Sequence, residues 1–248
     1  MKVIVDGLAI EYRDEGNGPV VLMLHGWKDT LHTFDPLVPA LAENHRVIRV
    51  DLPGFGGSEM PKDAWGVPEY AAFVAAFMRK ANVSAHAVIG HSFGGRLTLW
   101  GIGQGVFAAQ KIVLIASAGV AERKTVKNAS LRALAKVAKI AALPLPKRMR
   151  DQLRQRLYAG IKSDYAQTGR LRETFVKTIA LDLSAEAAKI EIPTLLIWGS
   201  ADPQTPLSEG VRLSKLIKGS TFSLIEAAGH FVHREHPDKV AASIAAFI

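Results

Sequence analysis

Short apolar runs alternate with amphipathic stretches along the first half of the chain. Compact apolar runs between turn residues predict buried strands, and apolar positions repeating every three or four residues predict helices. The predicted strands are residues 2–5, 8–12, 19–24, 46–50, 85–89 and 111–116, and the predicted helices are residues 35–44, 68–81 and 94–103. Because the later strands are almost wholly apolar and alternate with helices, we predict a mostly parallel central sheet flanked by helices on both faces.

This alternation stops at Gly119 and resumes near residue 189. Between them, residues 122–188 have helical spacing and no strand pattern, with breaks at Pro144 and Pro146. Two further strands, residues 192–198 and 220–225, and a final helix, residues 237–247, complete the pattern. We therefore predict an α/β core, residues 1–118 and 189–248, with an inserted helical cap, residues 119–188. Such a cap would cover the carboxyl ends of the strands, where open α/β sheets bind ligands.

Composition narrows the class of protein. The 248 residues are 48% hydrophobic, which suits one large α/β domain or a core with an insertion. The absence of cysteine excludes disulfides and thiolate metal sites. No apolar run approaches the roughly 20 residues of a membrane span, and the first residues lack the apolar segment of a signal peptide. We expect a cytoplasmic protein without a membrane span.

The net charge of +8 is concentrated in the predicted cap. Residues 121–180 hold 15 Lys and Arg against 4 Asp and Glu, so the rest of the chain is mildly acidic. A solvated face is the simplest interpretation, and an anionic substrate, an acidic carrier protein or a lipid surface is the alternative. Nucleic acid is disfavoured because no recognition motif accompanies the charge. The cap also has an apolar stripe, interpreted as packing onto the core or as lining for an acyl or aromatic pocket: Leu131, Leu134, Val137, Ala138 and Ala141.

A possible nucleophile follows the strand at residues 85–89. The run Gly90-His91-Ser92-Phe93-Gly94 fits G-x-S-x-G, in which a serine occupies a sharp strand-to-helix turn and the glycines avoid collisions. The serine hydroxyl would then lie above the end of the sheet, at the positive end of a helix. The pattern alone also fits an ordinary turn, so the hypothesis requires a base, an acid and donors for an oxyanion.

An acid and a base come directly after two later strands. Asp202 lies in Trp198-Gly199-Ser200-Ala201-Asp202-Pro203, and His230 follows Gly229. The chain order Ser92, Asp202, His230 is that of the α/β-hydrolase triad. In this hypothesis His230 takes the serine proton as general base, and Asp202 orients the imidazole and stabilises its charged form.

Rival residues fit less well. Asp51 lies before the nucleophile strand and suits a structural brace, whereas Asp182 ends the cap without a strand before it. His233 and His236 lie beyond His230 and further from the end of the strand. Other histidines lie in surface-like segments and are interpreted as solvated: His32, His45 and His86.

Two backbone N–H groups are candidates for the oxyanion hole. One belongs to Phe93, the residue after the nucleophile, and the other to Trp27 in the loop after the strand at residues 19–24. Gly26 lets this loop turn inward, and we expect His25 to brace it rather than to titrate in catalysis. We predict no metal and no cofactor, because a triad of this kind needs neither.

Together these motifs resemble the α/β-hydrolase family with a helical cap. The matching pieces are His25-Gly26-Trp27, Asp51-Leu52-Pro53-Gly54-Phe55-Gly56-Gly57-Ser58, Gly90-His91-Ser92-Phe93-Gly94-Gly95, Trp198-Gly199-Ser200-Ala201-Asp202-Pro203 and Gly229-His230. They span both halves of the core and leave only the cap unmatched. The resemblance is greatest to small carboxylesterase-like members, including pimeloyl-carrier-protein methyl esterases, which share the H-G-W loop.

The same motifs exclude some relatives. Haloalkane dehalogenases and soluble epoxide hydrolases carry aspartate where this chain has Ser92. Proline iminopeptidases carry H-G-G-P-G and carbon–carbon bond hydrolases usually H-G-x-G-P-G, whereas this chain has His25-Gly26-Trp27-Lys28-Asp29. The resemblance implies a serine hydrolase that cleaves a small carboxylic ester or thioester as a monomer or small homo-oligomer. A non-catalytic ligand-binding protein, an acyltransferase and a cofactor-free haloperoxidase stay open as alternatives.

Overall fold

The computed structural model describes residues 1–120 and 171–248. The strands are β1 (Lys2–Val5), β2 (Leu8–Glu15), β3 (Val20–Leu24), β4 (Arg46–Val50), β5 (Ala85–His91), β6 (Ala109–Ile115), β7 (Thr194–Gly199) and β8 (Thr221–Ile225). The helices are η1 (Leu31–Leu37, a 3₁₀ helix), α1 (Val38–Leu41), α2 (Val67–Lys80), α3 (Phe93–Gly103), α6 (Arg172–Ala180), α7 (Ser184–Ala187), α8 (Leu207–Leu216), α9 (Val232–Glu235) and α10 (Pro237–Phe247).

The eight strands form one sheet in the order β1-β2-β4-β3-β5-β6-β7-β8. β1 and β2 pair antiparallel, as do β2 and β4, and every later pair is parallel. The register aligns the carboxyl ends: His91 pairs with Ile115, Ile115 with Ile197, and Gly199 with Ile225. The loops after β5, β7 and β8 therefore meet at one edge of the sheet. This confirms the predicted mostly parallel α/β fold.

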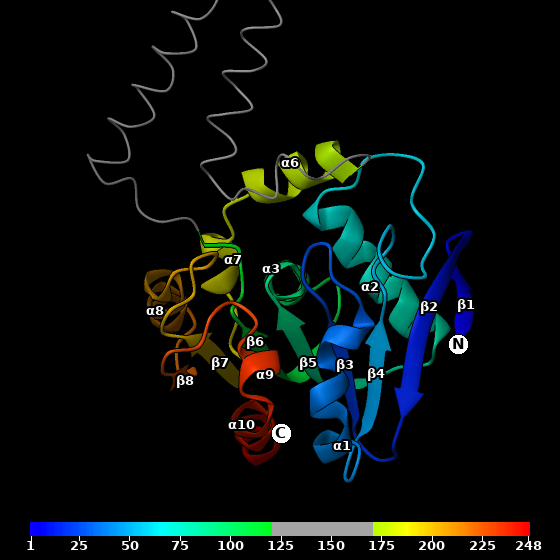
Figure 1. Cartoon of the computed structure of the whole chain (residues 1–248). Coiled ribbons are helices and arrows are strands. Elements are labelled where there is room, and N and C mark those ends of the chain that lie inside the picture. The colour runs from blue at the N-terminus through cyan, green and yellow to red at the C-terminus, as the bar shows by residue number, and fades with distance from the viewer. Residues whose placement is uncertain (121–170) are drawn as a thin grey trace, which may run out of the picture. The chain divides into compact units, whose positions relative to one another are not determined.

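Helices cover both faces of the sheet (Figure 1). On one face, η1, α1, α9 and α10 pack on a core of strand side chains that includes Met23, Ile89, Val113 and Ile197. On the other face, α2 and α3 pack side by side, with α3 against β5 and α7. The buried strands carry apolar side chains on both faces, because β-branched and leucine residues there exchange water for protein contacts on either side.

The segment predicted as a helix over residues 35–44 differs in the structure. It forms the 3₁₀ helix η1 followed by the single turn α1. Pro36 and Pro39 lack the backbone N–H that a continuous α-helix requires, so the first turns cannot complete the usual hydrogen bonds. The pattern also did not single out α8, whose buried residues are only Gly210 and Leu213.

The chain divides into two compact units, residues 1–121 with 177–248, and residues 122–176. In the first unit, the Leu183 N–H donates to the Gly119 carbonyl at 2.8 Å and Gln104 donates to the Glu186 carboxylate at 3.0 Å. Only residues 171–176 of the second unit are described. The cap at 119–188 therefore stays a prediction, and its apolar stripe and prolines lie outside the described residues.

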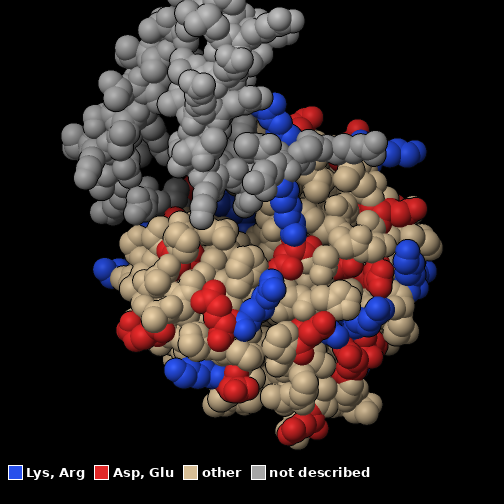
Figure 2. Space-filling view, viewed as in Figure 1, with Lys and Arg blue, Asp and Glu red and all other residues tan. Residues whose placement is uncertain are grey.

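The surface of the described core carries mixed charge. On the face shown in Figure 2, lysine and arginine side chains are interspersed with acidic ones. Most of the basic excess counted over residues 121–180 falls at residues 121–170, outside the described part of the chain. None of the helices described here is long and apolar enough to cross a membrane.

Candidate active site

Ser92 occupies a strained turn between β5 and α3. Its backbone has φ 51° and ψ −106°, in the left-handed half of conformational space that residues with a side chain rarely adopt. Its N–H donates to the Ile115 carbonyl at 3.0 Å, and its carbonyl accepts from the N–H groups of Arg96 and Ala118 at 3.1 Å each. These hydrogen bonds hold the strained conformation, which is a common property of functional residues.

The glycines around Ser92 are required by close backbone contacts. A Cβ on Gly90 would lie 2.6 Å from the Gly94 carbonyl oxygen, and a Cβ on Gly94 would overlap the Leu24 carbonyl. A Cβ on Gly95 would overlap the Ser117 hydroxyl. The G-x-S-x-G spacing therefore follows from the space that the turn leaves beside β3 and β5.

Asp202 and His230 form a buried acid–base pair. The Asp202 Oδ2 and His230 Nδ1 atoms are 2.8 Å apart, and both side chains are almost fully buried. The other oxygen, Oδ1, accepts from the N–H groups of Gln204 at 2.7 Å and Thr205 at 3.0 Å. Burial alone raises the pKa of Asp202, but the hydrogen bonds from His230 and Thr205 outweigh it, so the pKa is lowered. The carboxylate is thus ionised and oriented toward the imidazole.

Thr205 is a third member of this cluster that sequence reasoning missed. Its buried hydroxyl lies 2.7 Å from Asp202 Oδ2, 3.2 Å from His230 Nδ1 and 3.1 Å from the Ala116 carbonyl. One hydroxyl proton serves one acceptor at a time, so the group fixes the carboxylate while bridging to the end of β6. The signal was present in the spacing, because an aspartate commonly accepts hydrogen bonds from N–H groups two and three residues later.

His91 connects the serine turn to the histidine loop. Its Nε2 donates to the His230 carbonyl at 3.1 Å, and the two rings lie 4.9 Å apart. Burial lowers the pKa of His91 well below its ordinary value, and the neighbouring His233 and His230 lower it further. His91 is therefore neutral. Within the described residues no hydrogen bond joins the Ser92 hydroxyl to His230, so the hydrogen bond from His91 is the link between the two loops.

His233, a rival base in the sequence, has a different environment. Its Nε2 lies 2.9 Å from the Thr33 hydroxyl, and its ring is 4.4 Å from that of His91. Burial lowers the pKa of His233 to about 3, with contributions from Arg234 and His230. It is neutral at physiological pH and pairs with no carboxylate among the described residues.

The loop after β3 lies against the serine turn. His25 Nδ1 donates to the Gly26 carbonyl at 2.7 Å, while Nε2 accepts from the Leu52 N–H at 2.9 Å. These two bonds fix the tautomer, and burial lowers the pKa of His25. A Cβ on Gly26 would lie 3.4 Å from the Ser92 Cβ, so the backbone of this loop approaches the nucleophile closely.

The two residues whose N–H groups are the candidate oxyanion donors contact each other through their rings. The rings of Trp27 and Phe93 are 5.3 Å apart, and Phe55 lies 5.0 Å from Trp27 in an edge-to-face contact. Phe93 is the first residue of α3, where backbone N–H groups have no partner within the helix. The aromatic contacts therefore bring the Trp27 loop beside the helix end that carries the Phe93 N–H.

The rival acids have structural partners. Asp51 Oδ1 accepts from the Leu31 N–H at 2.7 Å, and Oδ2 accepts from the Gly57 N–H at 2.8 Å. Asp182 Oδ1 accepts from the N–H and hydroxyl of Ser184 at 2.9 and 2.6 Å, at the start of α7. His236 lies between α9 and α10, where its N–H donates to the Val232 carbonyl. The described residues contain no group of three His, Cys, Asp or Glu side chains that could hold a metal ion.

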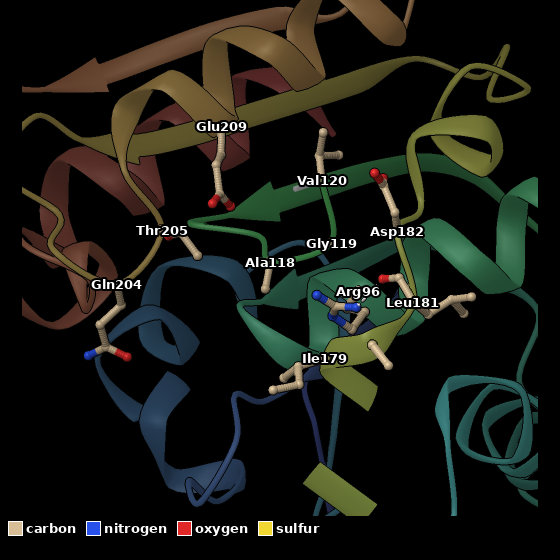
Figure 3. A pocket seen from close by; sticks show the side chains of 11 residues that line it. Arg96, Ala118, Gly119, Val120, Ile179, Leu181, Asp182, Gln204, Thr205 and Glu209 are labelled. Atoms are coloured by element: carbon tan, nitrogen blue, oxygen red, sulfur yellow. Dashed lines mark hydrogen bonds between the residues drawn. The ribbon is translucent and has the colours of Figure 1, made fainter. Parts of the chain in front are cut away.

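A cavity of about 250 Å³ (Figure 3) is lined in part by Thr205, whose hydroxyl contacts both Asp202 and His230. The lining includes Arg96 of α3, Glu209 of α8, and Thr205 in the loop before α8. Ala118 and Gly119, which follow β6, line it as well. Like Thr205, Arg96 is a lining residue that the sequence did not single out, since a lone arginine four residues after a serine belongs to no motif.

Together, a parallel sheet with a serine turn after β5 and an acid–base pair after β7 and β8 defines an α/β-hydrolase fold. The chain belongs to the alpha/beta hydrolase family, whose sequence profile matches residues 21–243. Monoacylglycerol lipase ABHD6 of Bos taurus is 28% identical over 94% of this chain and 76% of its own length. A pimeloyl-[acyl-carrier protein] methyl ester esterase of Neisseria meningitidis is 28% identical over 92% of both chains.

Among solved structures, a membrane phospholipase A described as a bacterial virulence factor is similar. It has 27% sequence identity and a TM-score of 0.78, with coverage of 100% of this chain and 84% of that one. These comparisons support a hydrolase with esterase- and lipase-type homologues, that is, ester hydrolysis at a general level.

Proposed function

We propose that the protein is a serine hydrolase that cleaves small carboxylic esters or thioesters through an acyl-enzyme. The observation that supports this most is the buried Asp202–His230 pair, 2.8 Å apart, at the same sheet edge as the strained Ser92. An imidazole whose Nδ1 is held by a carboxylate presents Nε2 as the atom that can accept a proton. A strained, partly buried serine on a sharp turn is the group that such a base activates.

In this mechanism the Ser92 Oγ attacks the ester carbonyl carbon while His230 Nε2 takes the hydroxyl proton. Collapse of the tetrahedral intermediate breaks the bond to the leaving group, which receives the proton from His230. Water then attacks the acyl-enzyme, again with His230 as base, and releases the acid and Ser92. We expect the hydrogen bond between Ser92 and His230 to form when substrate is bound, since catalytic contacts often tighten only then.

The negative charge on the carbonyl oxygen needs donors during this reaction. We assign the backbone N–H groups of Trp27 and Phe93 to this task, because the Trp27 loop packs against the first residue of α3. Each such donor typically lowers the barrier by about 3 to 4 kcal/mol. None of the steps calls for a cofactor.

The test is Ser92→Ala, compared with the wild type for hydrolysis of p-nitrophenyl butyrate and for labelling by a fluorophosphonate probe. We expect the variant to lose both, with an unchanged circular dichroism spectrum. Ser243→Ala is the matched control, since Ser243 is a partly exposed residue of α10 whose hydroxyl donates to the Lys239 carbonyl.

Three outcomes would replace the proposal. Retained hydrolysis in Ser92→Ala would remove Ser92 as the nucleophile. Neither labelling nor turnover in the wild type would favour a ligand-binding protein on the same fold. Labelling followed by ester products in added alcohol, rather than acid, would favour an acyltransferase.

A further inference from the structure

Arg96 is a buried cation at the wall of the cavity beside the acid–base pair. It is 8% exposed, and its Nη1 donates to the carbonyls of Thr178 and Leu181 at 2.7 Å each. Within the described residues no other hydrogen bond or ion pair engages its guanidinium, so the N–H groups on Nε and Nη2 have no acceptor. Burial lowers the pKa of Arg96 to about 10, although Glu209 and Asp182 act in the opposite direction.

Among the residues that the structure describes, the guanidinium charge therefore has no bonded counterion. Burying a guanidinium costs free energy unless an acceptor or an anion compensates it. Two carbonyl acceptors on one nitrogen satisfy only part of the five-donor group. Figure 3 shows the Arg96 side chain among the residues that line the cavity. A ligand carboxylate there would supply the missing acceptors in the planar, two-pronged geometry that guanidinium groups favour.

The cavity also borders the proposed catalytic residues. Ala118 lines it, and the Ala118 N–H donates to the Ser92 carbonyl at 3.1 Å. Thr205 lines it as well, and its hydroxyl contacts both Asp202 and His230. Ala118 therefore connects the cavity to the backbone of Ser92, and Thr205 connects it to the Asp202 carboxylate.

We propose that this cavity binds a carboxylate carried by the acyl part of the substrate, and that Arg96 is the residue that selects it. The inference rests on the proposed ester hydrolysis and names its substrate class: an ester of a short dicarboxylic acid. At roughly 30 Å³ for a water-sized group, about 250 Å³ holds about eight such groups, enough for a carboxylate and a few methylenes. The apolar side chains of Val120, Ile179 and Leu181 suit the methylenes.

The two carboxylates at the cavity refine this selectivity. Asp182 already accepts hydrogen bonds from Ser184, and Glu209 has interactions of its own. Their negative charge opposes a second charge on the ligand, because like charges in a partly buried site repel strongly. We therefore expect a single carboxylate to bind better than a phosphate dianion.

The kinetic test compares two esters of matched length, p-nitrophenyl hemisuccinate and p-nitrophenyl butyrate. For the wild type we expect a higher kcat/KM with the hemisuccinate. In Arg96→Gln the ratio of the two kcat/KM values should fall about tenfold to a hundredfold, since a hydrogen bond to a charged group is lost. Arg96→Lys keeps the positive charge but lacks the planar guanidinium group. Its ratio of kcat/KM values should lie between those of the wild type and Arg96→Gln. An equal loss for both esters, or no preference in the wild type, would overturn the inference.

Glu209→Gln provides a second test that leaves the backbone contacts of Arg96 in place. Removal of a negative charge from the cavity wall should raise the hemisuccinate-to-butyrate ratio about two- to tenfold. A ratio that falls or stays constant would contradict carboxylate binding here, even if Arg96→Gln proves too unstable to assay.

A binding measurement separates this inference from the proposed function. Monomethyl succinate is titrated into the Ser92→Ala protein by calorimetry, with and without Arg96→Gln. We expect binding that weakens at least tenfold without Arg96, and inorganic phosphate should bind less well. Binding that depends on Arg96, together with a wild type that hydrolyses no ester, would support the carboxylate site and refute the hydrolase. Ester hydrolysis by the wild type without such binding would support the hydrolase and refute the carboxylate site.

Discussion

The two halves of the candidate site are held together by different forces. The nucleophile turn is fixed by backbone geometry, since Ser92 sits at φ 51° and Gly90 and Gly94 leave no space for a Cβ. The acid–base half is fixed by side-chain hydrogen bonds among Asp202, Thr205 and His230. An added Cβ in the backbone turn displaces the whole turn. Removal of one side chain from the hydrogen-bond network removes only the bonds that this side chain makes.

The largest expected effect is at the nucleophile turn. Gly94→Ala would push a methyl group into the Leu24 carbonyl, and we expect a loss of about 3 kcal/mol in the free energy of unfolding. Fluorophosphonate labelling should fall together with stability, because the clash displaces the serine turn. The measurement is urea denaturation combined with labelling.

Gly219→Ala is the control for this prediction. Gly219 has nothing within 4 Å of its would-be Cβ, and, unlike Gly94, it has a positive φ of 74°, so only backbone strain of about 1 kcal/mol is expected there. Equal effects of the two substitutions would show that close packing does not hold the serine turn.

The next effect concerns pH and the buried histidines beside His230. Because burial lowers the pKa of His233 to about 3 from 6.5, the unfolded chain binds a proton below pH 6.5 that the folded protein does not. Stability is therefore complete above this pH and falls as the pH decreases toward 3. We expect the loss of unfolding free energy between pH 7 and pH 5 to be about 2 kcal/mol smaller in His233→Gln than in the wild type.

The measurement is urea denaturation at both pH values. His32→Gln is the matched control, since it removes an imidazole from an exposed side chain of η1. The explanation fails if His233→Gln keeps the acid sensitivity of the wild type.

The smallest expected effect tests a single bond of the acid–base half. Thr205→Val removes the hydroxyl that contacts Asp202 and Ala116, and we expect kcat to fall about tenfold with little change in KM. Thr205→Ser should restore most of kcat, because the hydroxyl returns. A change confined to KM, or no rescue by serine, would refute a positioning role for Thr205.

The same contrast explains how much could be predicted from the sequence. The strand pattern predicted the parallel sheet because burial on both faces imposes apolar residues locally. The sequence also indicated the glycines around Ser92. The turn leaves no space for a Cβ at these positions, so glycine must occur there at a fixed spacing from the serine. The helix expected over residues 35–44 was wrong, because Pro36 and Pro39 broke it into η1 and α1.

Hydrogen bonds between residues that lie far apart in the sequence could not be predicted from it. Nothing in the pattern places His91 beside the carbonyl of His230, because that hydrogen bond spans 139 positions. The role of Arg96 could not be predicted either. It depends on the hydrogen bonds to the carbonyls of Thr178 and Leu181 and on the cavity that Arg96 lines.

By itself, the sequence determined the fold class and proposed Ser92, Asp202 and His230 as the residues to examine. Local sterics and burial act on neighbouring residues, so they leave their record in residue type and spacing. Tertiary structure alone brought Asp202 to 2.8 Å from His230, added Thr205 to that pair and left a buried guanidinium at the wall of a cavity. Those distances depend on how the loops after parallel strands meet at one sheet edge.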